Sequence, residues 1–131
     1  MASVRKEVAV NVSPDRAWDA IRDVGALHTR VVPGFVADTR LEEGARVVTF
    51  ADGTVARELI VDIDDESRRL AYAIAPGGPI EHYAAAVQVV ADGDGSRIVW
   101  TIDLFPHNLE VYIADRMQAG IEAMKPALES A

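Results

Sequence analysis

The sequence contains no cysteine, so it can form neither a disulfide framework nor a thiolate nucleophile. Long hydrophobic runs are also missing, since no segment approaches the roughly 20 apolar residues that span a bilayer. The first residues, MASVRKEV, lack the apolar core of a signal peptide. We therefore expect a cytoplasmic protein with no integral membrane association.

Positive charge is scarce. Only 13 Lys and Arg residues stand against 21 Asp and Glu residues, which leaves a net charge of −8. Binding of nucleic acid requires clustered Lys and Arg that displace counterions from phosphates, so we expect no nucleic-acid partner. The three histidines lie far apart in the sequence and no HExxH motif occurs. We accordingly expect no metal site and no cofactor.

The N-terminal segment VAVNVSPDRAWDAI predicts a strand that leads directly into a helix. Val8, Val10 and Val12 alternate as in a half-buried strand. Ser13 suits a helix N-cap and Pro14 suits the first helical position, where a missing N–H costs nothing. Ala17, Trp18 and Ile21 then recur at helical spacing, and residues 24–29 predict a second short helical turn. In this arrangement we expect Trp18 to have a structural role, in which its ring fills space where the helix packs on the sheet.

Residues 35–104 predict strands that are joined by tight turns. The segments between the turns are rich in Val, Ile, Thr and aromatic residues, which favours antiparallel hairpins. The turn signals are Glu43-Gly44, Asp52-Gly53, residues 65–67, residues 76–79 and residues 92–95. After the strands, apolar residues recur at spacings of three and four from Leu109 to Leu128, which predicts one long helix with a single apolar stripe.

The order of one strand, two short helices, six strands and a long helix resembles the START-like superfamily, also called SRPBCC, in its polyketide cyclase/dehydrase-like branch. The segments that carry the resemblance are VNVSPDRAWDAI (10–21), VPGF (32–35), RELIVDIDDESRRLAY (57–72), HYAAAVQV (82–89), VWTIDLFP (99–106) and the last helix. The resemblance implies an α+β helix-grip fold, in which a curved antiparallel sheet of about seven strands wraps around the C-terminal helix. We expect residues 1–131 to form a single domain.

Relatives of this kind commonly enclose a cavity between the sheet and the long helix. Small-molecule sites are typically concave and largely apolar, with a few placed polar groups. Suitable walls are Phe50, Tyr72, Tyr83, Trp100, Ile113, Met117, Gly120 and Met124. The alternative for each of these residues is ordinary packing of a hydrophobic core, because an apolar stripe needs no further explanation.

Polar candidates are fewer. Alternation with Val55, Leu59 and Val61 assigns Arg57 to the inner face of its strand, where its guanidinium could bind a ligand carboxylate or oxyanion. The alternatives are a slip of register and an arginine near the strand end that reaches solvent. His82 and Asp103 form a second candidate, because a hairpin that pairs Val89 with Ile98 places them diagonally on one face.

A histidine that is oriented by a carboxylate can act as a general acid and base. The alternation assigns His82 and Asp103 to the outer face, where they would be a surface pair, and only a β-bulge in the hairpin would turn them inward. His28 is expected near the cavity mouth as an exposed histidine at a helix end.

Three hypotheses for function follow. The first is binding of a small hydrophobic or aromatic molecule, such as a lipid or a polyketide-like compound. The second is catalysis of the polyketide cyclase/dehydratase type, with Arg57 holding an oxyanion and with His82 and Asp103, or Tyr72 and Tyr83, moving protons. The third is an interaction module without a ligand, and an exposed sheet face can also support a homodimer.

Overall fold

The computed structural model describes residues 2–130, in which seven strands form one antiparallel sheet with the order β1-β7-β6-β5-β4-β3-β2. The strands are β1 (Ala2–Val10), β2 (Val36–Glu42), β3 (Ala45–Phe50), β4 (Val55–Asp64), β5 (Arg69–Ile74), β6 (His82–Asp92) and β7 (Gly95–Phe105). Consecutive strands from β2 to β7 are neighbours, and β1 closes the series beside β7. Turns fall where the sequence predicts them; Gly44, Gly53 and Gly93 adopt the positive φ angles that such turns favour in glycine.

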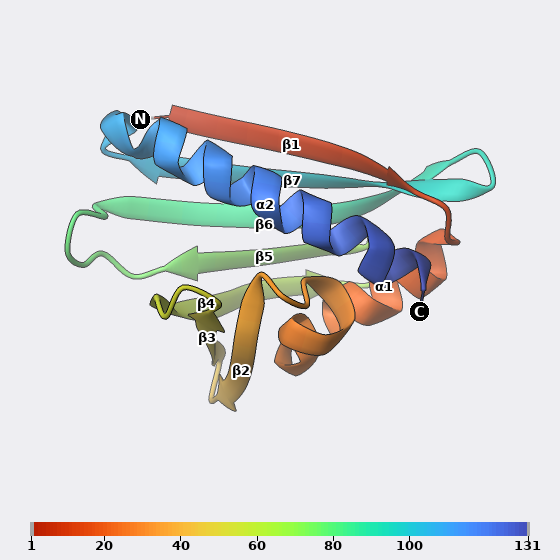
Figure 1. Ribbon diagram of the computed structural model, residues 1–131, viewed down its shortest axis with the longest axis horizontal. Coiled ribbons are helices and arrows are strands. Elements are labelled where there is room, and N and C mark those ends of the chain that lie inside the picture. The colour runs from red at the N-terminus through yellow and green to blue at the C-terminus, as the bar shows by residue number, and fades with distance from the viewer. Residues whose placement is uncertain (1, 131) are drawn as a thin grey trace.

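The long C-terminal helix α2 (Glu110–Glu129) lies across one face of the curved sheet (Figure 1). The predicted apolar stripe faces the strands, and its buried members are Ile113, Met117, Ile121, Met124 and Leu128. The helix and the inner face of the sheet together form the hydrophobic core. This arrangement is the helix-grip fold that the resemblance implied. No helix within residues 2–130 is long and apolar enough to cross a bilayer.

The helix α1 (Pro14–Arg22) and the short helical turns η1 (Val24–Ala26) and η2 (Leu27–Val31) follow β1. A third turn, η3 (His107–Leu109), precedes α2. As predicted, the Ser13 hydroxyl caps α1 by accepting from the Arg16 amide at 3.3 Å. Trp18 is 5% exposed, which agrees with the prediction that it fills space between α1 and the sheet.

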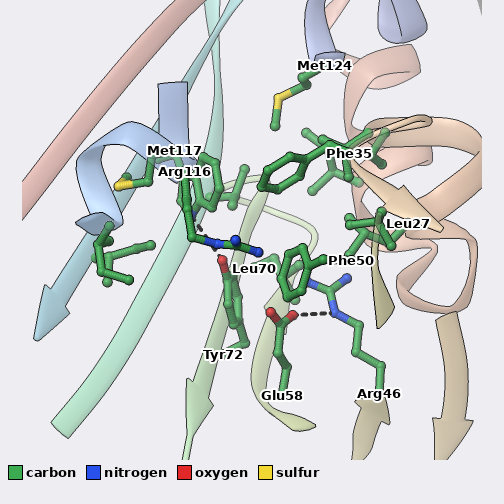
Figure 2. A pocket seen from close by; sticks show the side chains of 18 of the residues that line it. Leu27, Phe35, Arg46, Phe50, Glu58, Leu70, Tyr72, Arg116, Met117 and Met124 are labelled. Atoms are coloured by element: carbon green, nitrogen blue, oxygen red, sulfur yellow. Dashed lines mark hydrogen bonds and ion pairs between the residues drawn. The ribbon is translucent and has the colours of Figure 1, made fainter. Parts of the chain in front are cut away.

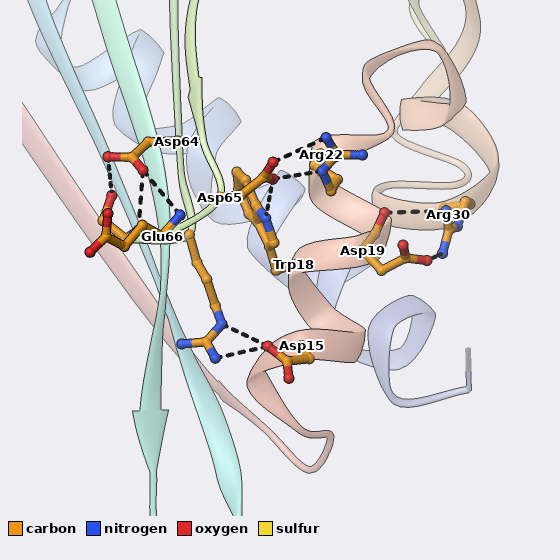
Figure 3. A network of polar contacts seen from close by, with 10 residues as sticks. Asp15, Trp18, Asp19, Arg22, Arg30, Asp64, Asp65 and Glu66 are labelled. Atoms are coloured by element: carbon orange, nitrogen blue, oxygen red, sulfur yellow. Dashed lines mark hydrogen bonds and ion pairs between the residues drawn. The ribbon is translucent and has the colours of Figure 1, made fainter.

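Polar contacts join α1 to the turn between β4 and β5 (Figure 3). The Trp18 indole N–H donates to Asp65 at 2.9 Å, and Arg22 donates to the same carboxylate at 2.8 Å. These two donors, Arg22 first, lower the pKa of Asp65. Arg68 donates to Asp15 at 2.8 Å. Asp65 and Arg68 of this turn therefore hold α1 against the sheet.

Candidate functional site

A cavity of about 80 Å³ lies between α2, η2 and the inner face of the sheet (Figure 2). Of the eight residues that the sequence predicts as walls, the lining includes Phe50, Tyr72, Tyr83, Trp100, Ile113, Met117 and Met124. Their contact with a ligand stays a prediction. Sites for drug-sized ligands measure roughly 300–1,000 Å³, so a larger ligand requires wall side chains to move. Met117 and Met124 are suited to such movement because methionine is unbranched and flexible.

Gly120, the eighth predicted wall residue, permits close packing of α2 on the aromatic side of the cavity. A Cβ atom at this position would lie 2.9 Å from a ring carbon of Trp100 and 3.4 Å from a ring carbon of Phe35. Any side chain here would displace Trp100. The absence of a side chain at Gly120 therefore leaves room for the Trp100 ring, which forms part of the cavity wall.

An ion pair between Arg46 and Glu58 forms one polar wall. These residues are direct cross-strand partners on β3 and β4, and the Arg46 Nε donates to the Glu58 carboxylate at 2.8 Å. The two residues are 3% and 5% exposed. Burial raises the pKa of the Glu58 carboxyl, while the adjacent Arg46 acts in the opposite direction. Each charge is compensated by the other, so the pair offers no net charge to a ligand.

Two tyrosine hydroxyls form a second polar group within the cavity. The Trp100 indole N–H donates to the Tyr72 hydroxyl at 3.0 Å, and Tyr83 lines the same cavity. Burial raises the pKa of both phenols, so both are protonated at neutral pH. The Tyr72 hydroxyl accepts from the Trp100 indole N–H, which cannot accept a proton in return. One hydroxyl proton is therefore available to a ligand oxygen.

Arg116 on α2 brings a positive charge to the cavity lining. Its guanidinium carbon lies 4.5 Å from the ring centroid of Phe50 and 5.6 Å from that of Phe35. Its Nη1 donates to Asp52, in the turn between β3 and β4, at 3.0 Å. The arginine side chain is 21% exposed and that of Asp52 is 54% exposed. The counterion of Arg116 therefore lies in solvent at the cavity edge.

The other oxygen of Asp52 accepts from the Thr54 amide at 2.9 Å, which closes the turn. This backbone hydrogen bond, a side-chain hydrogen bond from Thr54 and the Arg116 guanidinium together lower the pKa of Asp52 to about 2. Asp52 is therefore ionised throughout the neutral pH range.

The prediction that Arg57 faces the cavity is wrong. Its guanidinium pairs with Glu42 at 2.9 Å, and its side chain is 52% exposed. The neighbours assigned to the same inner face, Val55 and Val61, are 60% and 64% exposed. Arg57 thus has no geometry for holding a ligand oxyanion in this cavity.

A β-bulge explains the error. The register of β4 against β5 shifts between Ile60 and Asp62, so the bulge changes which face successive residues occupy. Before it, Glu58 and Ile60 point inward, and after it Ile63 does. Alternation extended through the bulge assigned the wrong face to the first half of the strand.

His82 and Asp103 are both exposed and lie on the outer face of the sheet. The predicted register is confirmed, since Val89 pairs with Ile98 and Ala84 pairs with Asp103. The described pairing of β6 with β7 is continuous, so no bulge turns the two residues inward. Asp103 instead accepts from the Ser3 hydroxyl at 2.6 Å. The two residues therefore lie on the outer face, as the alternative has it, but the partner found for Asp103 is Ser3.

Sequence reasoning missed Arg46, Glu58 and Arg116. Counting outward from a two-residue Asp52-Gly53 turn places Arg46 opposite Leu59, whereas the loop in the structure comprises residues 51–53, which shifts the register by one and pairs Arg46 with Glu58. Arg116 follows Ile113 by three residues and precedes Gly120 by four, so it lies at the border of the apolar stripe of α2. A charged residue at such a border can reach into a cavity.

A second hollow, of about 340 Å³, lies on the outer face of β5, β6 and β7. Short side chains, including Ala71, Ala73, Ala84 and Ala86, leave it open beside larger neighbours. It lies on the face of the sheet opposite α2, and its polar lining residues are Arg69, Gln88, Thr101 and the predicted candidate Asp103. Within residues 2–130, no group of three or more His, Cys, Asp or Glu side chains could hold a metal ion.

Known structures share this architecture. An uncharacterised protein from Bacillus thuringiensis superimposes with a TM-score of 0.85 at 18% identity, covering 97% of this chain and 98% of that one. Truncated norcoclaurine synthase from Thalictrum flavum superimposes with a TM-score of 0.75 at 19% identity, covering 98% and 91%. A protein from Thermobifida fusca has a TM-score of 0.72 at 29% identity, covering 98% and 91%.

No curated protein matches the chain. The family model described as polyketide cyclase/dehydrase and lipid transport matches residues 1–129. This match covers nearly the whole chain and agrees with the helix-grip architecture and the cavity beneath α2. The chain therefore belongs to the polyketide cyclase/dehydrase and lipid transport family of the SRPBCC superfamily.

Proposed function

We propose that this protein binds a small hydrophobic or aromatic molecule in the cavity between the sheet and α2. The observation that carries the proposal is the lining itself: apolar and aromatic walls surround a tyrosine hydroxyl that can donate to a ligand oxygen. The buried charges of Arg46 and Glu58 are already paired with each other. The apolar body of a ligand can therefore pack beside them without contacting an unpaired charge.

Ligand-dependent stability tests this proposal. The protein is screened by thermal unfolding against fatty acids, flavonoids and polyketide-like aromatics. A ligand that binds only the folded state adds about 2.7 kcal/mol of stability at 100 times its dissociation constant. If no compound of these classes stabilises the protein, the proposal is wrong.

A matched pair of variants locates the binding. Val87 lines the cavity, whereas Val90 on the same strand lies on the opposite face. Val87→Phe should fill the cavity and weaken binding, and Val90→Phe should leave affinity unchanged. Circular dichroism verifies that each variant is folded before affinities are compared. Equal loss of affinity in both variants would place the ligand elsewhere.

Catalysis is a second candidate because Tyr72, Tyr83 and Glu58 border the same cavity. The raised phenol pKa values make the tyrosines hydrogen-bond donors rather than bases at neutral pH. A β-triketone probe would then cyclise faster in the presence of the protein, with a lower kcat in Tyr72→Phe. Tight binding without turnover would leave the protein a binding module.

A further inference from the structure

We propose that the cavity selects ligands that carry a carboxylate on an apolar or aromatic body, and that Arg116 binds this carboxylate in place of Asp52. The inference rests on the proposed function, because it names the class of ligand for the same cavity. It comes from the difference between the two arginines that line the cavity.

Arg46 and Arg116 differ in where their counterions lie. Arg46 is paired with Glu58, and both side chains are almost completely buried. Removing Glu58 from Arg46 would leave a buried charge without a partner, which is costly. Arg116 is paired with Asp52, whose side chain is more than half exposed. Only the Arg116 pair can therefore exchange its anion without stranding a charge in the core.

Asp52 is well placed to leave. Exposed ion pairs contribute little to stability, and the Asp52 carboxylate would be solvated after release. The Thr54 amide binds Oδ1, whereas Arg116 binds Oδ2, so the turn keeps its own hydrogen bond when Arg116 changes partner. A carboxylate from a ligand would then occupy the position of Oδ2 beside Arg116.

Arg116 is also held in a suitable orientation. Its guanidinium lies against the Phe50 ring, and Phe50 packs edge-on against Phe35 at 5.4 Å between centroids. A guanidinium offers five N–H donors in a planar fork, and Asp52 is the acceptor found for it within residues 2–130. Donors therefore remain for a bidentate contact with a ligand carboxylate. The apolar body of the ligand would extend from there toward Met117 and Tyr72.

The test compares acids with their methyl esters, which share the apolar body but lack the charge. Two pairs are used, 2-naphthoate with methyl 2-naphthoate and decanoate with methyl decanoate. Affinities are measured by calorimetry in 0.15 M salt, which screens the net charge of −8 beyond about 8 Å. We expect the acid of a binding pair to bind at least about tenfold more tightly than its ester, as for one charge-assisted hydrogen bond.

Three variants assign this preference. Arg116→Gln should abolish the preference, so that acid and ester bind this variant with equal affinity, and Asp52→Asn should strengthen binding of the acid. Arg97→Gln is the matched control, because Arg97 forms a comparable exposed pair with Glu7 on the sheet and lies outside the cavity lining. The control should bind like the wild type.

The outcomes separate the two proposals. Esters that bind as tightly as acids, or a preference that survives Arg116→Gln, would overturn the inference and leave cavity binding intact. If none of the four compounds binds, the inference fails together with the proposed function on which it rests. Should Arg116→Gln not fold, the Arg116 Nε–H resonance of the wild type decides: it should shift with 2-naphthoate and not with the ester, and equal shifts would contradict the inference.

Discussion

The buried Arg46–Glu58 pair is the most demanding polar feature of the cavity, because each residue is stable there only beside the other. Glu58→Gln removes the negative charge and leaves the Arg46 guanidinium unpaired. We expect this variant to lose about 3 kcal/mol of unfolding free energy, measured by urea denaturation.

The double variant Arg46→Met/Glu58→Met is the control, since it removes both charges and keeps side chains of similar length. Replacing a whole buried pair by apolar residues is often neutral or stabilising by about 1–4 kcal/mol. A double variant as unstable as Glu58→Gln would show that the pair contributes more than mutual neutralisation.

The buried tyrosines predict how stability depends on alkaline pH. Burial raises the pKa of Tyr72 and Tyr83 in the folded state, so the unfolded chain loses these protons first as pH rises. Stability is therefore complete below the unfolded pKa of about 10 and falls above it, by up to about 1.4 kcal/mol per pH unit and per tyrosine.

Urea denaturation at pH 9, 10 and 11 measures this loss. The Tyr72→Phe/Tyr83→Phe variant has no phenol at either position and should show a shallower decline of unfolding free energy with pH. Equal slopes in the wild type and the variant would mean that the two phenols ionise alike in the folded and unfolded chains.

At the scale of the element, Gly120 lowers the helix propensity of α2 but leaves space for the Trp100 ring in the cavity wall. Gly120→Ala would improve helix propensity by about 1 kcal/mol, but the new Cβ would lie 2.9 Å from Trp100. We expect Trp100 to shift, which weakens its hydrogen bond to Tyr72 and narrows the cavity. Affinity for a cavity ligand should fall roughly tenfold, or about 1.4 kcal/mol.

Ala119, the preceding residue on α2, is exposed and supplies the control. Ala119→Gly should cost about 1 kcal/mol of stability through helix propensity and leave ligand affinity unchanged. If Gly120→Ala raised stability and kept full affinity, Trp100 would not limit the space at this point.

At the scale of the whole molecule, the first and last strands are neighbours and α2 packs against β1. The N-terminal strand and the C-terminal helix therefore pack against each other. We expect residues 1–131 to unfold as a single domain in one cooperative transition. The two tryptophans report on different places, Trp18 on the contact of α1 with the sheet and Trp100 on the cavity.

Variants with one tryptophan each, Trp18→Phe and Trp100→Phe, allow the two signals to be followed separately. Within each variant, the fluorescence midpoint in urea should coincide with the midpoint by circular dichroism. Loss of the Trp18 signal before the sheet unfolds would indicate that α1 detaches independently.

Much of this architecture could be predicted because its signals are local. The Ser13 cap, the glycine turns and the apolar stripe of α2 each depend on residues within a few positions of one another, and the structure has them where the patterns indicate. The cavity walls were predictable for the same reason, since aromatic and apolar residues of known faces must meet beneath α2.

The charged residues of the site depended on tertiary structure. A single bulge in β4 placed Glu58 inside and Arg57 outside, and alternation alone gives no sign of an extra residue in a strand. Arg116 and Asp52 are 64 residues apart in the sequence and meet only because the fold brings the β3–β4 turn within reach of the Arg116 side chain. The sequence by itself determined the elements and their apolar faces, whereas the fold decided which charges face the cavity, because a strand's phase and long-range contacts are set by the packing of the whole sheet.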